Sequence, residues 1–212
     1  MHKPVTIVAL LFVLSGTLAA QTHATHQQPA TKPSPADEKA TAGAAAQKYF
    51  TDVELVNQDG VKMRLYSDLM KGHTVVIIPF FTTCTAVCPP MNATMSKIQQ
   101  ELGDRVGKDV HLISISVDPE TDTPERLKAY GAKFKAKPGW YLVGGKKENV
   151  DTALSKLGMF VENRNDHNTI MVIGNVQTGL WKKAFALAAP AELVKIIQSV
   201  ADDPQADAPR KQ

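Results

Sequence analysis

Cys84 and Cys88 are the only two thiols in this chain of 212 residues. Thr85, Ala86 and Val87 separate them. Because there is no third cysteine, any disulfide, redox or thiolate–metal chemistry within the chain has to use this pair. Soft thiolates select Cu(I), and one added imidazole would complete a three-coordinate site. The same two thiols could instead form a disulfide.

The residues around the pair predict a turn between a strand and a helix. An apolar run, Val75 to Phe81, precedes the pair, and Pro89 follows it directly. Proline suits the first turn of a helix, because its missing N–H would have no partner there. We therefore expect a helix from about Cys88, with Cys84 in the preceding loop. The free N–H groups and the helix dipole at that end favour a thiolate at Cys88.

The spacing of the two cysteines leaves both a disulfide and a metal site open. Residues four apart in a helix have Cβ atoms about 5–6 Å apart. A disulfide needs about 3.5–4.5 Å. The loop before the helix can close that gap. If the thiols stay reduced, the wider spacing suits two sulfurs that reach a metal from one side.

A third ligand has to come from a distant histidine. His73 falls in a Lys-Gly-His-Thr turn and His111 opens a predicted strand, so exposure or packing is expected of both. His167 lies in a polar loop that leads into the apolar run 170–173. If the sheet places that loop opposite the cysteine turn, His167 is a candidate ligand, with a solvated loop residue as the alternative. Two further histidines, in a proline-rich tether, are expected to be solvated: His23 and His26.

The N-terminus has the pattern of an export signal. His2 and Lys3 give a basic start, and Val5 to Leu14 is apolar except for one threonine. Small residues follow up to Ala20, as at a cleavage site. A membrane span needs about 20 apolar residues, so we expect residues 1–20 to be a cleaved signal, with an uncleaved anchor as the alternative. The domain is then expected in a bacterial periplasm, where disulfides persist.

Composition divides the remainder of the chain. Residues 21–47 are rich in Pro, Ala, Thr, Gln and Lys and predict a flexible linker. Residues 48–201 form one predicted domain, and residues 202–212 a disordered tail. The net charge is only +3 and no arginine-rich run occurs, so nothing supports nucleic-acid binding. Contact with a membrane is expected only through an uncleaved N-terminal segment.

Strand and helix patterns alternate between the tails. Met91 and Met95 fall on an apolar helical stripe, so we expect packing rather than thioether ligation. Strands are predicted over 53–56, 61–65, 75–81, 110–117, 140–143, 169–173 and 180–184. Helices are predicted over 91–102, 123–134, 147–157 and 190–200. This order predicts an α/β fold of thioredoxin-like type, with a central mixed β-sheet flanked by helices and an N-terminal β-hairpin.

Several motifs occur in a fixed order along residues 49–200. They are Cys84-Thr85-Ala86-Val87-Cys88-Pro89, Ser114-Ile115-Ser116-Val117-Asp118-Pro119, Asp122-Thr123-Pro124, Leu127, Tyr130, Trp140 and Asp166-His167. In this combination the chain resembles the Sco/SenC family, thioredoxin-fold copper proteins that serve cytochrome c oxidase assembly.

The resemblance implies a site and a function. Copper ligands would be Cys84, Cys88 and His167, holding one Cu(I) or Cu(II) per domain. The protein would be a monomeric metallochaperone that delivers copper to the dinuclear copper centre of cytochrome c oxidase. Its partners would be the copper-bearing oxidase subunit and other periplasmic copper carriers. Asp118 and Asp166 are expected to orient the site or His167 through hydrogen bonds, with a simple turn role as the alternative for Asp118.

The main alternative is a thiol-disulfide oxidoreductase that uses Cys84 and Cys88 as a catalytic redox pair. Such enzymes usually carry Cys-x-x-Cys and a cis-proline opposite it. This chain has three residues between the cysteines and no proline within 161–179, so metal binding is favoured over enzymatic activity. A peroxidase with Cys84 as the reactive thiol is a weaker third interpretation. The family usually has a proline and an aspartate between its cysteines, and their absence here bears on the docking surface.

Overall fold

The computed structural model describes residues 35–203, with side chains from residue 43 onward. The predicted export signal, residues 1–20, lies outside the described residues. So do the first part of the predicted linker, with His23 and His26, and the tail from residue 204.

Seven strands form one mixed sheet in the order β2-β1-β5-β4-β3-β6-β7. The strands are β1 (Glu54–Asn57), β2 (Lys62–Arg64), β3 (Thr74–Phe80), β4 (Val110–Ser116), β5 (Trp140–Gly144), β6 (Ile170–Asn175) and β7 (Leu180–Phe185). β3 and β4 are fully buried, as their unbroken apolar sequences predicted. The mixed sheet and its N-terminal hairpin, β1 with β2, confirm the predicted fold class.

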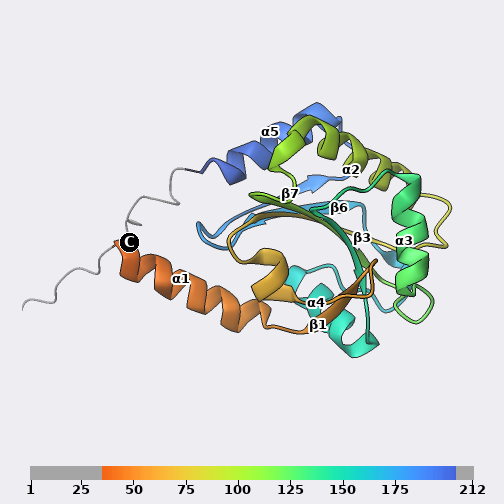
Figure 1. The fold of residues 1–212 in the computed structure, drawn as a ribbon, viewed down its shortest axis with the longest axis horizontal. Coiled ribbons are helices and arrows are strands. Elements are labelled where there is room, and N and C mark those ends of the chain that lie inside the picture. Colours follow the sequence, from red (N-terminus) through yellow and green to blue (C-terminus); the bar gives the residue numbers. More distant parts are fainter. Residues whose placement is uncertain (1–34, 204–212) are drawn as a thin grey trace, which may run out of the picture. The chain divides into compact units, whose positions relative to one another are not determined.

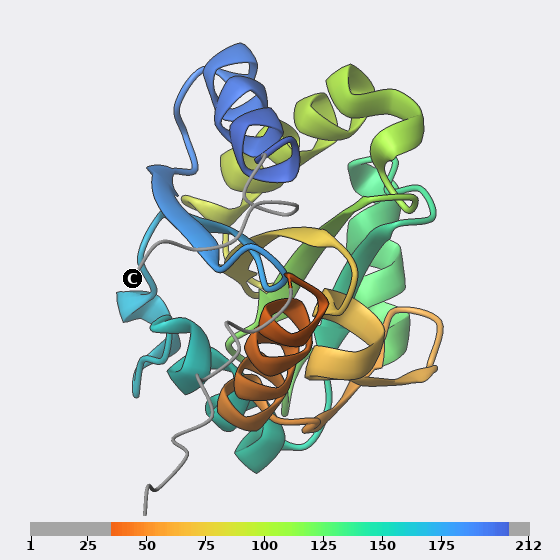
Figure 2. The same ribbon diagram turned by 90° about the vertical axis from the view of Figure 1, so that its left-hand side faces the viewer.

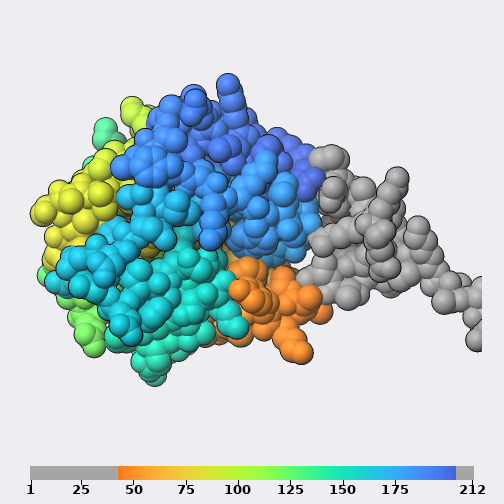
Figure 3. Space-filling view, turned by 180° about the vertical axis from the view of Figure 1, so that it is seen from behind, coloured from red at the N-terminus to blue at the C-terminus, as the bar shows by residue number. Residues whose placement is uncertain are grey.

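Helices cover both faces of the sheet (Figures 1 and 2). One apolar core lies under α2 (Cys88–Leu102), α3 (Pro124–Lys133) and α5 (Pro190–Ala201). The other lies under α1 (Pro35–Phe50), the short π-helix η1 (Leu65–Met70) and α4 (Lys147–Leu157). α1 and α4 lie side by side on the surface (Figures 2 and 3). Burial of apolar surface on both faces stabilises the sheet that carries the cysteine turn.

The sheet brings the cysteine turn and the histidine loop to the same edge. β3 runs parallel to β4 and antiparallel to β6. The end of β3 and the start of β6 therefore meet, and the segments beyond them become neighbours. These segments carry Cys84 and Cys88 after β3, and His167 before β6.

The helix α1 corrects one boundary of the sequence analysis. A flexible linker was predicted up to residue 47, but Pro35–Phe50 is helical. This segment contains six alanines, the best helix former, and Pro35 suits a first helical position. The Tyr66 hydroxyl donates a hydrogen bond of 2.9 Å to the Gly43 carbonyl and joins α1 to η1. Among residues 35–203, no helix combines the length and the apolar character needed to cross a membrane.

Candidate metal centre

Two sulfurs and one imidazole nitrogen converge at the edge of the sheet. The Sγ atoms of Cys84 and Cys88 and a ring nitrogen of His167 all lie within 4.8 Å of one another. Cys88 Sγ is 3.3 Å from His167 Nε2. Both cysteines are free thiols. The structure thus brings together the two cysteines and the one histidine that the sequence analysis selected.

The turn before α2 directs main-chain N–H groups at Cys84. The N–H of Cys88 donates to Cys84 Sγ over 3.4 Å. Burial acts to raise the pKa of Cys84, but hydrogen bonds from the Cys88 thiol and from the N–H groups of Cys88, Ala86 and Val87 outweigh burial and lower this pKa overall. Cys84 is half-buried. It is therefore the cysteine that most readily becomes a thiolate within reach of solvent.

Cys88 behaves in the opposite way, and this corrects the sequence analysis. The helix α2 does begin at Cys88, as Pro89 predicted. A thiolate was expected there because of the helix dipole. Cys88 is instead fully buried, and burial, followed by its hydrogen bond to Cys84, raises the pKa of its thiol. Desolvation outweighs the dipole, whose effect on a charge is about 0.3–1 kcal/mol at an exposed site.

His167 has the orientation and protonation state that a ligand needs. It is 8% exposed, and burial lowers its pKa, so the ring is neutral at pH 7. Its Nδ1 lies 3.3 Å from the main-chain carbonyl of Asn168. A carbonyl can only accept, so Nδ1 carries the proton and Nε2 presents its lone pair to Cys88. A main-chain carbonyl on the second ring nitrogen is the usual arrangement for a metal-binding histidine.

The two aspartates expected beside the site do not contact His167. The Asp118 carboxylate forms an ion pair with Arg164. Asp166 is exposed, and its own N–H donates to the carbonyl of Asn163. The prediction that these aspartates form hydrogen bonds to His167 is therefore wrong, because the Asn168 carbonyl lies at the His167 Nδ1 atom. Asp118 instead contacts the histidine loop through its ion pair with Arg164.

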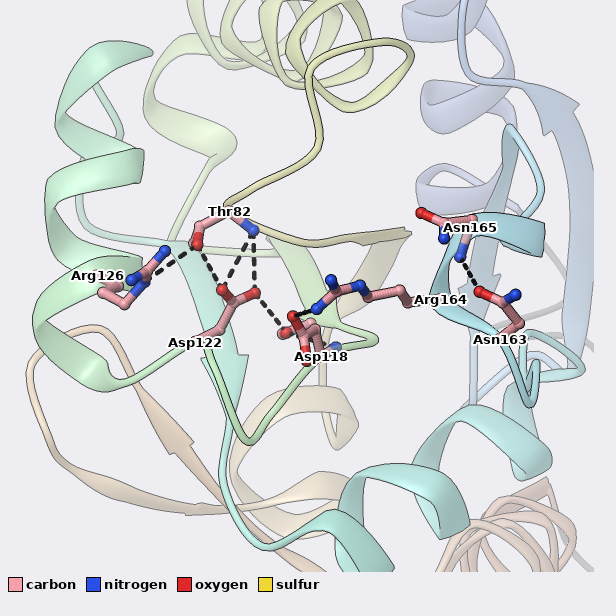
Figure 4. Close-up of polar contacts among 8 residues, drawn as sticks. Thr82, Asp118, Asp122, Arg126, Asn163, Arg164 and Asn165 are labelled. Atoms are coloured by element: carbon pink, nitrogen blue, oxygen red, sulfur yellow. Dashed lines mark hydrogen bonds and ion pairs between the residues drawn. The ribbon is translucent and has the colours of Figure 1, made fainter.

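A third aspartate, Asp122, anchors the turn, and the sequence analysis assigned it no role in the site (Figure 4). Its carboxylate, 1% exposed, accepts hydrogen bonds from the Thr82 N–H at 3.0 Å, the Thr82 hydroxyl at 2.5 Å and the Ser116 hydroxyl at 2.6 Å. These bonds join the end of β4 to the segment that precedes Cys84. The only sequence signal for this anchor was its place in the motif Asp122-Thr123-Pro124.

Other potential ligands are used elsewhere. Met91 and Met95 are fully buried in the core under α2, which confirms their predicted packing role. The His111 Nδ1 lies 2.8 Å from the Leu69 carbonyl. The His73 ring stacks on the His111 ring, with centroids 3.6 Å apart. Two thiols and a neutral imidazole form a donor set that suits a soft metal ion such as copper.

Comparisons with known proteins agree with this geometry. The sequence profile of the SCO1/SenC family matches residues 41–202. The SCO1 protein homolog of Bacillus subtilis (strain 168) is 42% identical over 78 residues, 37% of this chain and 39% of that protein. A putative copper-binding protein of Stutzerimonas stutzeri is 26% identical over 113 residues, 53% of each chain. The chain thus spans about half or less of the length of these two relatives.

The fold is shared with a solved structure. That of BsSco, described as a member of the Sco family of cytochrome c oxidase assembly proteins in which a disulfide switch was identified, aligns with a TM-score of 0.59 and 26% identity. The alignment covers 71% of this chain and 91% of that chain. This likeness confirms the predicted thioredoxin-like fold. Because the family profile matches well over half of its residues, the chain belongs to the SCO1/SenC family.

Proposed function

We propose that this protein is a copper carrier that binds one Cu(I) through Cys84, Cys88 and His167 and delivers it to the dinuclear copper site of cytochrome c oxidase. The observation that carries the proposal is the convergence of two sulfurs and a neutral imidazole within 4.8 Å. Three ligands of this softness suit Cu(I) and disfavour hard cations such as Mg²⁺. The oxidase is the inferred recipient, since BsSco is described as a cytochrome c oxidase assembly protein.

The burial of the three ligands suggests how the cargo is exchanged. Cys88 and His167 are buried, whereas Cys84 is half-buried. An incoming thiolate or imidazole can therefore reach the metal on the Cys84 side. The lowered pKa of Cys84 makes the loss of its proton on metal binding less costly than for an ordinary thiol. Exchange of one ligand at a time keeps the ion coordinated during transfer.

We also propose that the protein works in the bacterial periplasm, as a monomer. The pattern of an export signal in residues 1–20 supports this location. An oxidising compartment also gives the pair a second state, since oxidation of the free thiols to a disulfide removes both sulfur ligands. Copper loading then requires the reduced pair.

A Cu(I) titration of the reduced protein tests the proposal. We expect one Cu(I) per chain, and near loss of binding in Cys84→Ser and Cys88→Ser. His167→Ala should weaken the affinity by more than about 100-fold, the upper range for residues that only orient a ligand. His73→Ala is the matched control, because its ring stacks on His111 and lies outside the ligand set.

The same variants separate the carrier from the oxidoreductase. The copper affinity could be unchanged in His167→Ala while the wild type rapidly reduces insulin disulfides. That result would contradict the copper-carrier function and favour the thiol-disulfide oxidoreductase. Delivery is tested by mixing the loaded protein with a copper-free soluble fragment of the copper-bearing oxidase subunit. Transfer should appear as the absorption spectrum of the dinuclear centre, after addition of oxidant, and its absence would contradict the role in delivery.

A further inference from the structure

The loop that carries His167 is tied to the rest of the domain through one arginine. Arg164 begins the short 3₁₀ turn η3 (Arg164–Asp166), three residues before the histidine. Its guanidinium forms an ion pair with Asp118, which lies just after β4 (Figure 4). The Asp118 side chain is 11% exposed and that of Arg164 44% exposed. A carboxylate this deeply buried needs its cationic partner more than one on the surface does.

The same guanidinium also lies against the cysteine side of the site. The Arg164 carbon Cζ is 5.4 Å from the centroid of the Phe81 ring. The Phe81 ring meets the His167 ring edge to face, with centroids 5.5 Å apart and an interplanar angle of 89°. Arg164, Phe81 and His167 therefore form a contact series from the loop surface to the ligand. Phe81 itself directly precedes the turn that carries Cys84.

The remainder of the loop makes only local polar contacts. The Asn163 side chain accepts from the Asn165 N–H, and the Asp166 N–H donates to the Asn163 carbonyl. Within residues 162–166, as the structure describes them, Arg164 alone makes a hydrogen bond or ion pair to another part of the domain. Removal of its side chain would leave the segment before His167 held by contacts within itself.

At the other end of the ion pair, Asp118 is held by hydrogen bonds at the end of β4. The Asp118 N–H donates to the Ser116 hydroxyl over 3.0 Å. That hydroxyl in turn donates to Asp122, which also holds Thr82. The main chain of Asp118 is thus tied to the hydrogen bonds that join the ends of β3 and β4, next to the cysteine turn (Figure 4).

We propose that Arg164 is a positioning residue that holds His167 over the cysteine pair and slows the release of Cu(I). We call Arg164, Asp118 and Phe81 the arginine clamp. This inference rests on the proposed copper function of the same site. The clamp acts on the lifetime of the complex, because an imidazole whose loop is fixed returns to the metal faster than it escapes. A partner that breaks the ion pair would thereby promote release.

The test measures transfer of Cu(I) from the loaded protein to an excess of a chromogenic Cu(I) chelator. We expect Arg164→Ala and Asp118→Asn each to accelerate release about tenfold, because each variant breaks the ion pair to a carboxylate that is only 11% exposed. The double variant should show no further acceleration. Arg164→Lys keeps the charge but loses the planar fork and the ring contact, so it should be intermediate. Arg126→Ala is the matched control, since it removes a guanidinium that touches Thr82 at 3.4 Å and lies outside the clamp.

A double-mutant cycle with His167 distinguishes positioning from a general effect of charge. In a His167→Ala background, Arg164→Ala should change the release rate less than about twofold, because the clamp acts through the missing ring. Equal acceleration in both backgrounds, or equal acceleration by Arg126→Ala, would overturn the proposal. Unchanged release in Arg164→Ala would overturn it as well.

A readout without copper separates this inference from the proposed function. Amide hydrogen exchange at residues 163–168 of the metal-free protein should be faster in Arg164→Ala and unchanged in Arg126→Ala. If the wild type fails to bind Cu(I) but the exchange result is as expected, the copper function is contradicted, while the structural role of the arginine clamp is supported. If copper binds as expected but Arg164→Ala changes neither amide exchange nor copper release, only the arginine clamp is contradicted.

Discussion

The Nε2 atom of His167 lies 3.3 Å from the Sγ atom of Cys88, although 79 residues separate them in the chain. The antiparallel pairing of β3 with β6 brings the two segments to one edge of the sheet. The tautomer set by the Asn168 carbonyl then directs the Nε2 lone pair at the sulfur. The fold itself thus holds the two side chains together, which would reduce the ordering that binding of a metal ion requires.

The opposite pKa shifts of the two cysteines predict a difference in reactivity. Cys84 has a lowered pKa and is half-buried, whereas Cys88 has a raised pKa and is fully buried. Iodoacetamide at pH 7 should alkylate Cys84 first, and Cys88→Ser should remain reactive while Cys84→Ser becomes slow. Both cysteines lie in the tryptic peptide 72–97, so fragmentation of this peptide by tandem mass spectrometry over time measures the two rates. Faster labelling of Cys88 would support the expected thiolate at the helix start and contradict the assignment of the more reactive thiol to Cys84.

The buried carboxylate of Asp122 predicts a large loss of stability on truncation. Asp122→Ala should lower the free energy of unfolding by about 2–4 kcal/mol, because it leaves the Thr82 and Ser116 donors without their acceptor. Glu120→Ala is the control, since Glu120 is exposed in the same loop and should change stability by no more than about 0.5 kcal/mol. Urea unfolding of the reduced, metal-free protein measures both. Equal losses of stability in the two variants would contradict the anchoring role of Asp122.

His111 predicts a loss of stability in acid. Burial, opposed by the hydrogen bond to Leu69 and assisted by nearby His73, lowers the pKa of His111 from 6.5 to about 4. The unfolded chain therefore takes up a proton that the folded chain excludes. The contribution is fully present above about pH 6.5 and is lost as the pH falls towards 4, by no more than about 1.4 kcal/mol per pH unit.

Urea unfolding at several pH values between 7 and 4 measures this loss. His111→Gln should flatten the pH dependence in that window, because glutamine does not titrate. NMR titration of the His111 ring gives the pKa directly. A ring that titrates near 6.5 in the folded protein, or a variant as pH-sensitive as the wild type, would contradict the prediction.

Much of the fold follows from sequence pattern, because local signals and tertiary packing agree there. Asn57 to Gly60 marks the first hairpin, and the unbroken apolar runs of β3 and β4 mark buried strands. The helix α1 was missed because prolines and polar residues near its start suggested a linker, while its alanines favour a helix. Element boundaries elsewhere differ by a few residues, as expected where helix and strand ends fray.

The sequence predicted which side chains converge, but it did not predict their electrostatics. The family resemblance and the loop position led to His167, which the structure places beside Cys88. The thiolate was assigned to the wrong cysteine, since sequence does not reveal that the turn amides point at Cys84 while Cys88 is desolvated. Arg164 gave no signal at all, because its partner Asp118 lies 46 residues away in sequence and meets it only in the folded domain.

X-ray absorption at the copper edge of the Cu(I)-loaded, reduced protein tests the central claim most directly. The wild type should give two sulfur scatterers and one nitrogen scatterer in the first shell, with the outer-shell pattern of an imidazole. His167→Ala should lose the nitrogen and the imidazole pattern, and His73→Ala should match the wild type. A wild-type spectrum with sulfur ligands only, unchanged by His167→Ala, would contradict a site built from both thiols and this imidazole.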